Sequence, residues 1–307
     1  MVREKKIILL AGPSASGKSK LAVHLAKNLN VDIINADSMQ VYKEISVLSS
    51  RPTSNDLNIV KHHLYGFNSV RKAFSTGRWL KMTTNKINQL WSKNRTAIIV
   101  GGTGLYFKAL TDGLVEIPDI PINLRKKIRE LHKKIGQKNF FVKLTKLDPL
   151  VKQFLSPSDS HRSMRAYEVK KFTNKSFFLF ANETKSKFEK KNFKKLFINI
   201  PRVLSHKKVD ERVEKMFKEG AVEEVKKFLQ MEVNKELSSN KIIGIKEIKD
   251  YIEGRATLGK TKELIKLKTR QYIKRQFTWA RGHMRSWNMI YSPNFNDLFK
   301  QALEKIS

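Results

Sequence analysis

The segment from Ala11 to Ser19 reads A-G-P-S-A-S-G-K-S, and it directly follows the apolar run Ile7 to Leu10. Its last eight residues fit the pattern G-x-x-x-x-G-K-[ST], and residues 18–29 have the periodicity of a helix with one apolar face. A loop between a strand and a helix of this kind binds anions, because its backbone N–H groups surround the anion at the positive end of the helix. The alternative is a chance glycine turn, but such a turn needs neither a strand before it nor a helix after it. The sequence therefore predicts a phosphate-binding loop.

The residue types within this loop predict how each position contributes. Lys18 supplies a point charge to the phosphate groups, and the Ser19 hydroxyl can bind Mg²⁺. The other candidate phosphate-binding residues form the loop around the anion: Gly12, Pro13, Ser14, Ala15, Ser16 and Gly17. The pattern does not indicate whether the bound phosphates are cleaved, transferred or released.

Two further short apolar runs, residues 31–35 and 96–100, have the composition of strands that are buried on both faces. Such strands alternating with helices predict an α/β fold with a parallel sheet, and the phosphate loop makes this core similar to that of P-loop NTPases. Ligands of these sheets lie beyond the carboxyl ends of the strands. We therefore expect the loops at residues 12–19, 36–40 and 101–106 to converge on one crevice.

The chain changes in character after Pro118, where prolines are followed by a long helical stretch rich in lysine and arginine. The run Ile198 to Pro201 then has the pattern of a strand that returns to the sheet, and residues 207–306 are again helical in pattern. We therefore expect three segments: residues 1–118 as the first part of the core, residues 119–200 as an inserted and mainly helical domain, and residues 201–307 as the second, helical part of the core.

The charge of the chain indicates a polyanionic partner. The sequence has 62 lysines and arginines against 28 aspartates and glutamates, and its formal net charge of +34 is well above what solubility requires. In the last third of the chain, Arg270, Lys274 and Arg281 are expected to share one helix face. A nucleic acid is the first candidate, and the alternative is a lysine-rich proteome in which every surface is basic.

Cysteine is absent from the sequence, which excludes disulfide bonds, thiolate zinc sites and a cysteine nucleophile. The N-terminus has about four apolar residues before the phosphate loop, and no window approaches the ~18 apolar residues of a membrane span. We therefore expect a soluble, cytoplasmic protein that has no membrane partner.

Polar loops follow the second and third predicted strands. Asp37 could hold Mg²⁺, as the acidic residue after an apolar strand does in an ATPase. It could instead accept a proton from a second substrate, or it could simply cap a helix. Thr103 lies between glycines in G-G-T-G-L-Y, where a residue that only forms a turn is the alternative to a functional one. Two polar loops at one crevice favour an acceptor molecule that is bound beside the phosphates.

Seven motifs occur in an order that resembles one protein family. They are G-P-S-A-S-G-K-S, A-D-S-M-Q-V-Y, H-H-L at 62–64, G-G-T-G-L-Y, D-S-H-R-S-M-R-A-Y-E-V at 159–169, I-G-I-K-E at 243–247 and T-R-Q-Y-I-K-R-Q-F-T-W-A-R at 269–281. Together they resemble the bacterial tRNA dimethylallyltransferases, also called tRNA isopentenyltransferases, over nearly the whole chain. The resemblance implies transfer of a dimethylallyl group from dimethylallyl diphosphate to N6 of adenosine 37 in tRNA, with release of diphosphate.

The resemblance also implies roles for individual residues. Asp37 takes the proton from the adenine amine, and Thr103 lies between Asp37 and the diphosphate. Arg212, in V-D-E-R-V-E-K-M, corresponds to an arginine that contacts the diphosphate, although an arginine on a solvated helix face is the alternative. The loop then holds a leaving group, with Mg²⁺ at Ser19, and no phosphoryl group moves.

The positions implied to contact the anticodon stem-loop of tRNA lie in the core loops and in the insert. They are Asp37, Ser38, Met39, Gln40, Thr103, Arg125, His161, Arg162, Ser163, Met164 and Arg165. For residues 161–165 the alternative is a helix N-terminus with exposed basic side chains. The target adenine has to leave its stack to reach such a site, and we expect the protein to act on it as a monomer.

The chain departs from the family's pattern at peripheral positions. Leu48 to Pro52 stands where the family has G-T-A-K-P, so a lysine contact is either replaced by Arg51 or lost. Ile245 stands in place of a tyrosine and Lys208 in place of an arginine. Two other functions fit the phosphate loop alone: a small-molecule kinase, which needs no basic insert, and a non-catalytic RNA-binding ATPase, which needs a purine-binding motif that we do not find.

Overall fold

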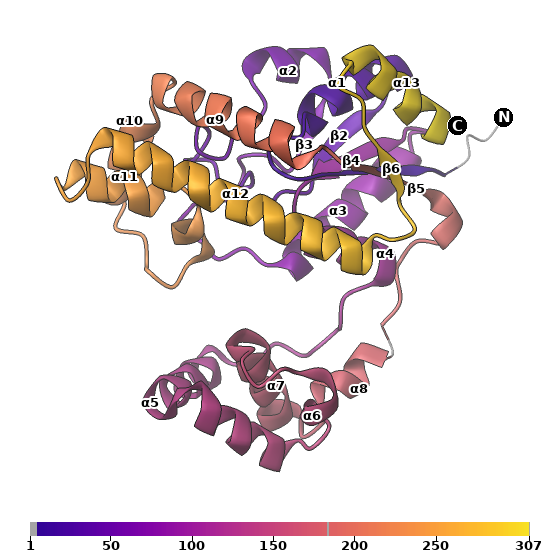
Figure 1. The fold of residues 1–307 in the computed structure, drawn as a ribbon. Coiled ribbons are helices and arrows are strands. Elements are labelled where there is room, and N and C mark those ends of the chain that lie inside the picture. The colour runs from indigo at the N-terminus through magenta and orange to yellow at the C-terminus, as the bar shows by residue number, and fades with distance from the viewer. Residues whose placement is uncertain (1–4, 183, 307) are drawn as a thin grey trace. The chain divides into compact units, whose positions relative to one another are not determined.

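The computed structural model describes residues 5–182 and 184–306, and the chain divides into two compact units. The first unit combines residues 1–111 with residues 188–307, and the second consists of residues 112–187. Figure 1 shows that the second unit is inserted into the chain of the first. Each unit is described here by itself.

The first unit is built on a parallel sheet of six strands, in the order β3-β2-β4-β1-β5-β6. The strands are β1 (Ile7–Ala11), β2 (Asp32–Asn35), β3 (His62–His63), β4 (Ala97–Gly101), β5 (Phe193–Ile198) and β6 (Asn288–Ile290). This arrangement confirms the predicted α/β fold and the three predicted strands β1, β2 and β4. Because β1 lies between β4 and β5, the loop that follows β1 is at the centre of the carboxyl edge.

Alternate residues of the central strands face opposite sides of the sheet and enter two separate apolar cores. Ile7 and Leu9 pack with residues of α3 (Thr76–Trp91), α4 (Gly104–Asp112) and the end of α12 (Leu258–His283). Ile8 and Leu10 pack on the other face with α1 (Lys18–Leu29) and α13 (Phe295–Ile306). The helix predicted over residues 18–29 is therefore confirmed, and its apolar face covers the sheet.

A third apolar core joins the long loop after β2 to the C-terminal helices. The helical elements of this region are α2 (Ser54–Ile59), α9 (Arg202–Lys218), α10 (Ala221–Gln230), the 3₁₀ turn η2 (Ser238–Lys241), α11 (Ile245–Ile252) and α12. Val41, Ile45 and Leu48 of the loop are buried against residues of α9 to α12. Ile245, which stands where the family has a tyrosine, is a buried member of this core and has 4% of its surface exposed.

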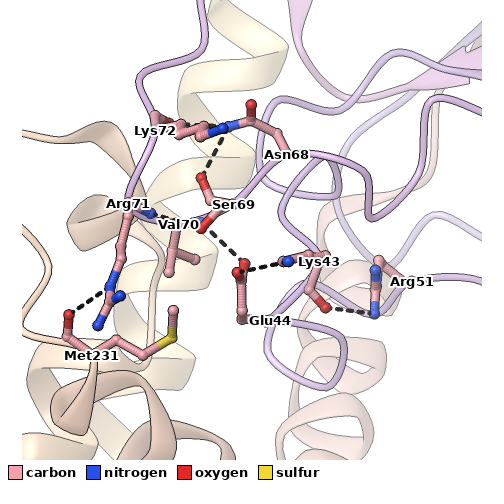
Figure 2. Close-up of polar contacts among 9 residues, drawn as sticks. All are labelled: Lys43, Glu44, Arg51, Asn68, Ser69, Val70, Arg71, Lys72 and Met231. Carbon is pink, nitrogen blue, oxygen red and sulfur yellow. Dashed lines mark hydrogen bonds and ion pairs between the residues drawn. The ribbon is translucent and has the colours of Figure 1, made fainter.

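Hydrogen bonds hold the same loop in place, as Figure 2 shows. Glu44 accepts the Val70 N–H at 3.0 Å, Arg51 donates to the Lys43 carbonyl at 3.1 Å, and Arg71 donates to the Met231 carbonyl at 2.9 Å. Outside the figure, the Glu224 carboxylate of α10 accepts the backbone N–H groups of residues 46, 47 and 48 at 2.6, 2.8 and 2.9 Å. Hydrogen bonds therefore hold the loop both at residues 43–51 and at residues 70–71.

The second unit is helical and has its own core. It contains α5 (Ile122–Leu147), α6 (Val151–Phe154), α7 (Ser160–Thr173) and α8 (Phe177–Asn182). Helix α5 is interrupted at Gly136, whose φ of 73° and ψ of 164° are not helical. Ile128, Phe140 and Leu144 of α5 pack on Tyr167 of α7. The helical unit therefore has a small apolar core of its own, which is separate from the three cores of the first unit.

The structure differs from the predicted boundaries at both ends of the insert and in one strand. The compact helical unit begins at residue 112 and not at residue 119 as predicted. The compact helical unit ends at residue 187, and after the 3₁₀ turn η1 (Lys190–Asn192) the chain forms β5, so residues 193–200 do not belong to the insert as predicted. The sequence predicts the returning strand at residues 198–201, whereas β5 already ends at Ile198. Lys194 and Lys195 interrupt the apolar pattern of this strand and hide it in the sequence. The strand β6 lies in a region predicted to be helical. Asn288 and Met289 are exposed, so a three-residue edge strand leaves no period-two signal.

None of the helices in the described ranges combines the length and the hydropathy that a membrane crossing requires.

Candidate active site

The loop between β1 and α1 has the backbone conformation of an anion site. Ala15 has a φ of 59° and Gly17 a φ of 84°, both in the left-handed region. Left-handed and right-handed residues that follow one another turn successive N–H groups toward one point, and Gly17 adopts this conformation without a steric cost. The N–H groups of residues 17–19 open α1 and have no acceptor among the described residues. They are therefore available to a bound anion.

Other polar groups of the loop are already engaged. The Ser14 N–H donates to Oε1 of Gln276 at 2.9 Å, and the Ser16 N–H donates to the Pro13 carbonyl at 3.3 Å. The Ser16 hydroxyl is buried and has no partner among the described residues. Ser19 is exposed at the start of α1. The donors of the loop without a partner among the described residues therefore include the Ser16 hydroxyl and the N–H groups of residues 17–19, and Ala15 contributes its left-handed conformation.

Three charged side chains influence one another at this loop. Burial lowers the pKa of Lys18 to about 8, while the Asp37 carboxylate opposes this shift and the Arg212 guanidinium adds to it. Burial also lowers the pKa of Arg212, and the charge of Asp37 again opposes the shift. Two desolvated cations near one carboxylate leave an excess of positive charge, which an anion would offset. Arg212 is partly buried and lines one cavity together with Asp37, so it does not lie on a fully solvated helix face.

The loops that follow β2 and β4 are bound to each other around Asp37. The Ser38 N–H donates to the Thr103 hydroxyl at 2.9 Å, the Thr103 hydroxyl donates to the Ser38 hydroxyl at 3.3 Å, and the Thr103 N–H donates to the Ala36 carbonyl at 3.1 Å. A Cβ at Gly101 would lie 2.1 Å from the Ala36 backbone, so this close approach requires glycine. The predicted convergence of the three loops is confirmed.

The Asp37 carboxylate uses one oxygen within the protein. Its Oδ1 accepts the Met39 N–H at 2.9 Å, and Oδ2 has no hydrogen bond among the described residues. The next helix after Asp37 begins at Ser54, so the interpretation of Asp37 as a helix N-cap is wrong. Burial and the negative charge of Asp37 raise the pKa of Tyr106 and of Tyr272.

A cavity of about 270 Å³ brings the phosphate loop and Asp37 together. Ser14, Asp37 and Arg212 line it, together with Tyr272 and Arg275 of α12. Its apolar wall consists of Met39, Leu48, Met216, Ile242, Ile243 and Ile265. The cavity therefore brings Ser14 of the phosphate loop, the Asp37 carboxylate, two guanidinium groups and an apolar surface together.

A second cavity of about 220 Å³ lies on the Thr103 side of the same loops. Tyr272 and Arg275 line this cavity as well as the first, and its further lining includes Gly12, Gly102, Thr103, Phe107, Phe197, Gln276 and Trp279. The two cavities therefore meet at α12. The Trp279 indole N–H is buried and has no acceptor among the described residues.

Three residues of α12 were missed as site residues. Tyr272, Arg275 and Gln276 share a helix face because they are spaced three and four residues apart. Gln276 accepts from the Ser14 N–H and donates to the Gly102 carbonyl at 2.9 Å, so it joins two of the site loops. The face proposed from sequence is a different one, and its Arg270 pairs with Asp210. The motif T-R-Q-Y-I-K-R-Q contains all three residues, but nothing in their residue types indicates which of them face the site loops.

In the helical unit, the candidate residues at the start of α7 have different environments. Asp159 caps this helix by accepting the Arg162 N–H at 3.0 Å. His161 and Arg162 are exposed, whereas Ser163 is fully buried and donates to the Asp159 carbonyl at 2.6 Å. The two remaining positions are also engaged, since Met164 packs on the core of the unit and Arg165 pairs with Glu168 at 3.2 Å.

Arg125 lies in the first turn of α5 in the same unit. Its side chain is partly buried, and its Nε atom is buried without a hydrogen-bond partner in residues 5–182 and 184–306. A buried guanidinium donor without a partner costs free energy unless another molecule supplies an acceptor.

Comparisons with known proteins agree with the motifs. A family model described as IPP transferase matches residues 40–283, more than half of the chain. A tRNA dimethylallyltransferase of Pelagibacter ubique (strain HTCC1062) is 49% identical over 307 residues, which cover 100% of this chain and 98% of that protein.

Two solved structures share the fold. A full-length tRNA isopentenylpyrophosphate transferase from Bacillus halodurans is similar with a TM-score of 0.69 and 27% identity, over 98% of both chains. A eukaryotic dimethylallyltransferase, described as acting on tRNA, is similar with a TM-score of 0.84 and 24% identity, over 98% of this chain and 77% of that chain. From the family match, the full-length relative and the parallel sheet with its phosphate loop, we conclude that this chain belongs to the IPP transferase family.

Proposed function

We propose that this protein transfers a dimethylallyl group from dimethylallyl diphosphate to N6 of adenosine 37 in tRNA and releases diphosphate. The observation that carries the proposal is the first cavity, where an anion-binding loop, a carboxylate with a free oxygen and an apolar wall meet. The transfer of a phosphoryl group does not itself require an apolar wall beside the phosphates. An allylic diphosphate needs both surfaces, because its leaving group is a polyanion and its transferred group is a hydrocarbon.

The diphosphate binds in this proposal at the opening of α1. The N–H groups of residues 17–19, the Lys18 ammonium and the Arg212 guanidinium contact its oxygens. The five-carbon chain packs against the apolar wall that contains Leu48, Met216 and Ile242. These contacts direct the allylic carbon toward Asp37, which lines the same cavity.

Mg²⁺ fits this site as an ion that binds mainly to the substrate. No group of three His, Asp or Glu side chains that could hold a metal alone occurs in the described part of the chain. Mg²⁺ typically keeps several waters and binds through one or two protein oxygens together with phosphate oxygens. The exposed Ser19 hydroxyl at the start of α1 is therefore the protein ligand that we propose. The ion would neutralise charge that develops on the departing diphosphate.

The reaction forms one bond and breaks another. The adenine N6 attacks the allylic carbon, the bond from that carbon to the diphosphate oxygen breaks, and the bonding electrons leave with the diphosphate. Oδ2 of Asp37 takes the proton that N6 loses, and a general base in this position contributes typically about 10²–10⁴ to the rate. Thr103 keeps the loop of Asp37 and Ser38 joined to the loop after β4. Lys18, Arg212 and the loop N–H groups stabilise the negative charge on the leaving group.

The helical unit provides the tRNA contacts in this proposal. The exposed His161 and Arg162 face RNA phosphates, and the Arg125 guanidinium has an unpartnered donor that a phosphate would satisfy. Ser163 supports this surface from within the helix, and Met164 and Arg165 flank it. In the core, Asp37 to Gln40 and Thr103 receive the extruded adenosine and its neighbours. All of these residues come from one chain, so the proposal requires only a monomer.

One incubation series tests the function. The protein is mixed with labelled dimethylallyl diphosphate or with labelled ATP, each with and without tRNA, and label is measured in the RNA and in small molecules. We expect label in tRNA from dimethylallyl diphosphate alone. Transfer of the ATP γ-phosphate to a small molecule would favour a kinase, and hydrolysis of ATP that depends on RNA would favour a non-catalytic switch.

Affinity for dimethylallyl diphosphate should fall as the pH rises above about 8. Lys18 has its pKa near 8 in the free protein, and a bound polyanion stabilises the charged ammonium. Below that pH Lys18 is already charged and the affinity should be constant, whereas above it binding must take up a proton. The expected decrease is up to about tenfold per pH unit. Calorimetry in buffers of different ionisation enthalpy measures the proton uptake, and a flat profile above pH 8 would contradict this role of Lys18.

Removal of the Arg162 guanidinium by Arg162→Ala should weaken tRNA binding and reduce the slope of log affinity against log salt by about one. The reason is that this exposed side chain would release a counterion when it meets a phosphate. Lys171→Ala is the matched control, because Lys171 is exposed on the opposite face of α7. If dimethylallyl diphosphate affinity alone changes, the assignment of this surface to RNA is wrong.

A further inference from the structure

Asn35 is the last residue of β2, has 0% of its surface exposed and has no part in the chemistry proposed above. Its Oδ1 accepts the Asp37 N–H at 2.8 Å, and its Nδ2 donates to the Asp37 carbonyl at 2.9 Å. The same Nδ2 also donates to the Leu64 carbonyl at 3.0 Å. A single buried amide therefore binds both backbone polar groups of the residue that carries the reactive carboxylate.

The neighbours of Asp37 are held by other groups. The Ala36 N–H donates to the Val100 carbonyl at 2.8 Å, the Ala36 carbonyl accepts from Thr103, and the Ser38 N–H donates to the Thr103 hydroxyl. In the part of the chain that the structure describes, the Asp37 backbone is bonded to Asn35 alone. Loss of the Asn35 amide would therefore free the Asp37 peptide groups while the flanking residues remain attached to β4 and its loop.

Asn35 is itself held by hydrogen bonds to the residue that follows β3 and to a residue of α3. Leu64 has a φ of 62°, and this left-handed conformation directly follows β3, whose residues pair with Ile33 and Ile34 of β2. His63 of the same strand bonds to the buried Asp32 carboxylate at 2.8 Å. On the opposite side, the Trp79 indole of α3 donates to the Asn35 carbonyl at 2.7 Å. Both the side chain and the backbone of Asn35 are thus held by hydrogen bonds within the first unit.

We propose that Asn35 is the positioning residue for Asp37, which directs Oδ2 of that carboxylate into the first cavity. The inference rests on the proposed function, because it assumes that Asp37 is the base. Only an amide meets the requirement, since the position needs one acceptor for the Asp37 N–H and two donors for two carbonyls. A displacement of about 1 Å in a reacting group can cost about 10²-fold in rate. Asn35 therefore acts on the rate of transfer and leaves substrate binding unchanged.

Three substitutions separate hydrogen bonding from size. Asn35→Ala removes all three bonds, Asn35→Ser keeps an oxygen that can accept the N–H two residues on, and Asn35→Asp keeps the size but sets a carboxylate against two carbonyl oxygens. We expect single-turnover transfer to fall about 10-fold to 10²-fold in Asn35→Ala and Asn35→Asp, with Asn35→Ser intermediate. Dimethylallyl diphosphate affinity and tRNA affinity should stay within about twofold of the original protein, as expected for a role confined to position.

Thr261→Ala is the control for lost stability, because Thr261 is fully buried in α12 and donates one hydrogen bond to the Thr257 carbonyl at 3.0 Å. It should lower Tm without a change in the single-turnover rate of the folded protein. The proposal is overturned if Asn35→Ala and Asn35→Asp behave in the same way as Thr261→Ala, or if they lose substrate affinity in proportion to rate. Retained transfer in Asp37→Asn would instead remove the assignment of the base itself, so the two failures are distinguishable.

Discussion

Replacing Asp37 by alanine should lower the rate of dimethylallyl transfer by about 10²–10⁴, while tRNA binding stays within a few fold. The adenine amine is a weak nucleophile because its lone pair is delocalised into the ring, so removal of its proton assists the attack. Oδ2 of Asp37 has no hydrogen bond among the described residues, and Asp37 lines the cavity together with Ser14 and Arg212. Single-turnover transfer from labelled dimethylallyl diphosphate to tRNA measures the loss, and a gel-shift titration measures tRNA affinity.

Two further variants sharpen this result. Asp37→Asn retains an oxygen that can accept the Met39 N–H, so it preserves the local turn and removes only the base. Glu211→Ala removes an exposed carboxylate that lies next to Arg212 in the sequence, and it should not affect transfer. Asp37→Asn should be as slow as Asp37→Ala. Turnover equal to that of the original protein in either Asp37 variant would place the base elsewhere.

The second large effect is expected for Lys18→Ala, which should lower kcat/KM for dimethylallyl diphosphate by about 10²–10³. The Lys18 side chain is partly buried, burial lowers its pKa to about 8, and its ammonium donates to the Pro13 carbonyl at 3.0 Å. In a site with little water, a positive charge next to the leaving group stabilises both the bound diphosphate and its departure. Steady-state kinetics and calorimetry separate these two contributions.

Lys27→Ala provides the matched control, since Lys27 is exposed at the other end of α1. It should leave both the affinity and the rate unchanged. If Lys18→Ala itself leaves both unchanged, the loop binds a different ligand and ATP becomes the first ligand to test.

The parts of the fold that were predictable are those whose residues carry a local pattern. The strands β1 and β4 are apolar runs, β2 contains the apolar pair Ile33 and Ile34, and the loop after β1 has a pattern that specifies its own conformation. The strand β5 contains lysines, and β6 is short and partly exposed, so neither has a recognisable period. Their places in the sheet depend on pairing with distant strands.

The site was predictable to a similar degree. Asp37 and Thr103 follow apolar strands, so their positions at the carboxyl edge follow from the topology of a parallel sheet. Gln276 and Tyr272 could not be assigned from sequence, because the choice among the faces of α12 depends on how the helix packs. The burial of Ser163 depends in the same way on the packing of α7 against α5. Charge patterns identify exposed faces, and buried polar contacts require the tertiary structure.

The bridge made by Gln276 also sets the order in which the site can be completed during synthesis. The Ser14 N–H and the Gln276 side chain are separated by 262 positions, and the Gly102 carbonyl by 174. A ribosome releases the phosphate loop, the first five strands and the whole helical unit before α12 exists. Local helices can form in that interval, but contacts across such long stretches of chain form late. The nascent protein therefore lacks a locked phosphate loop until its final helices emerge, and a chain truncated before residue 276 has no means of locking it.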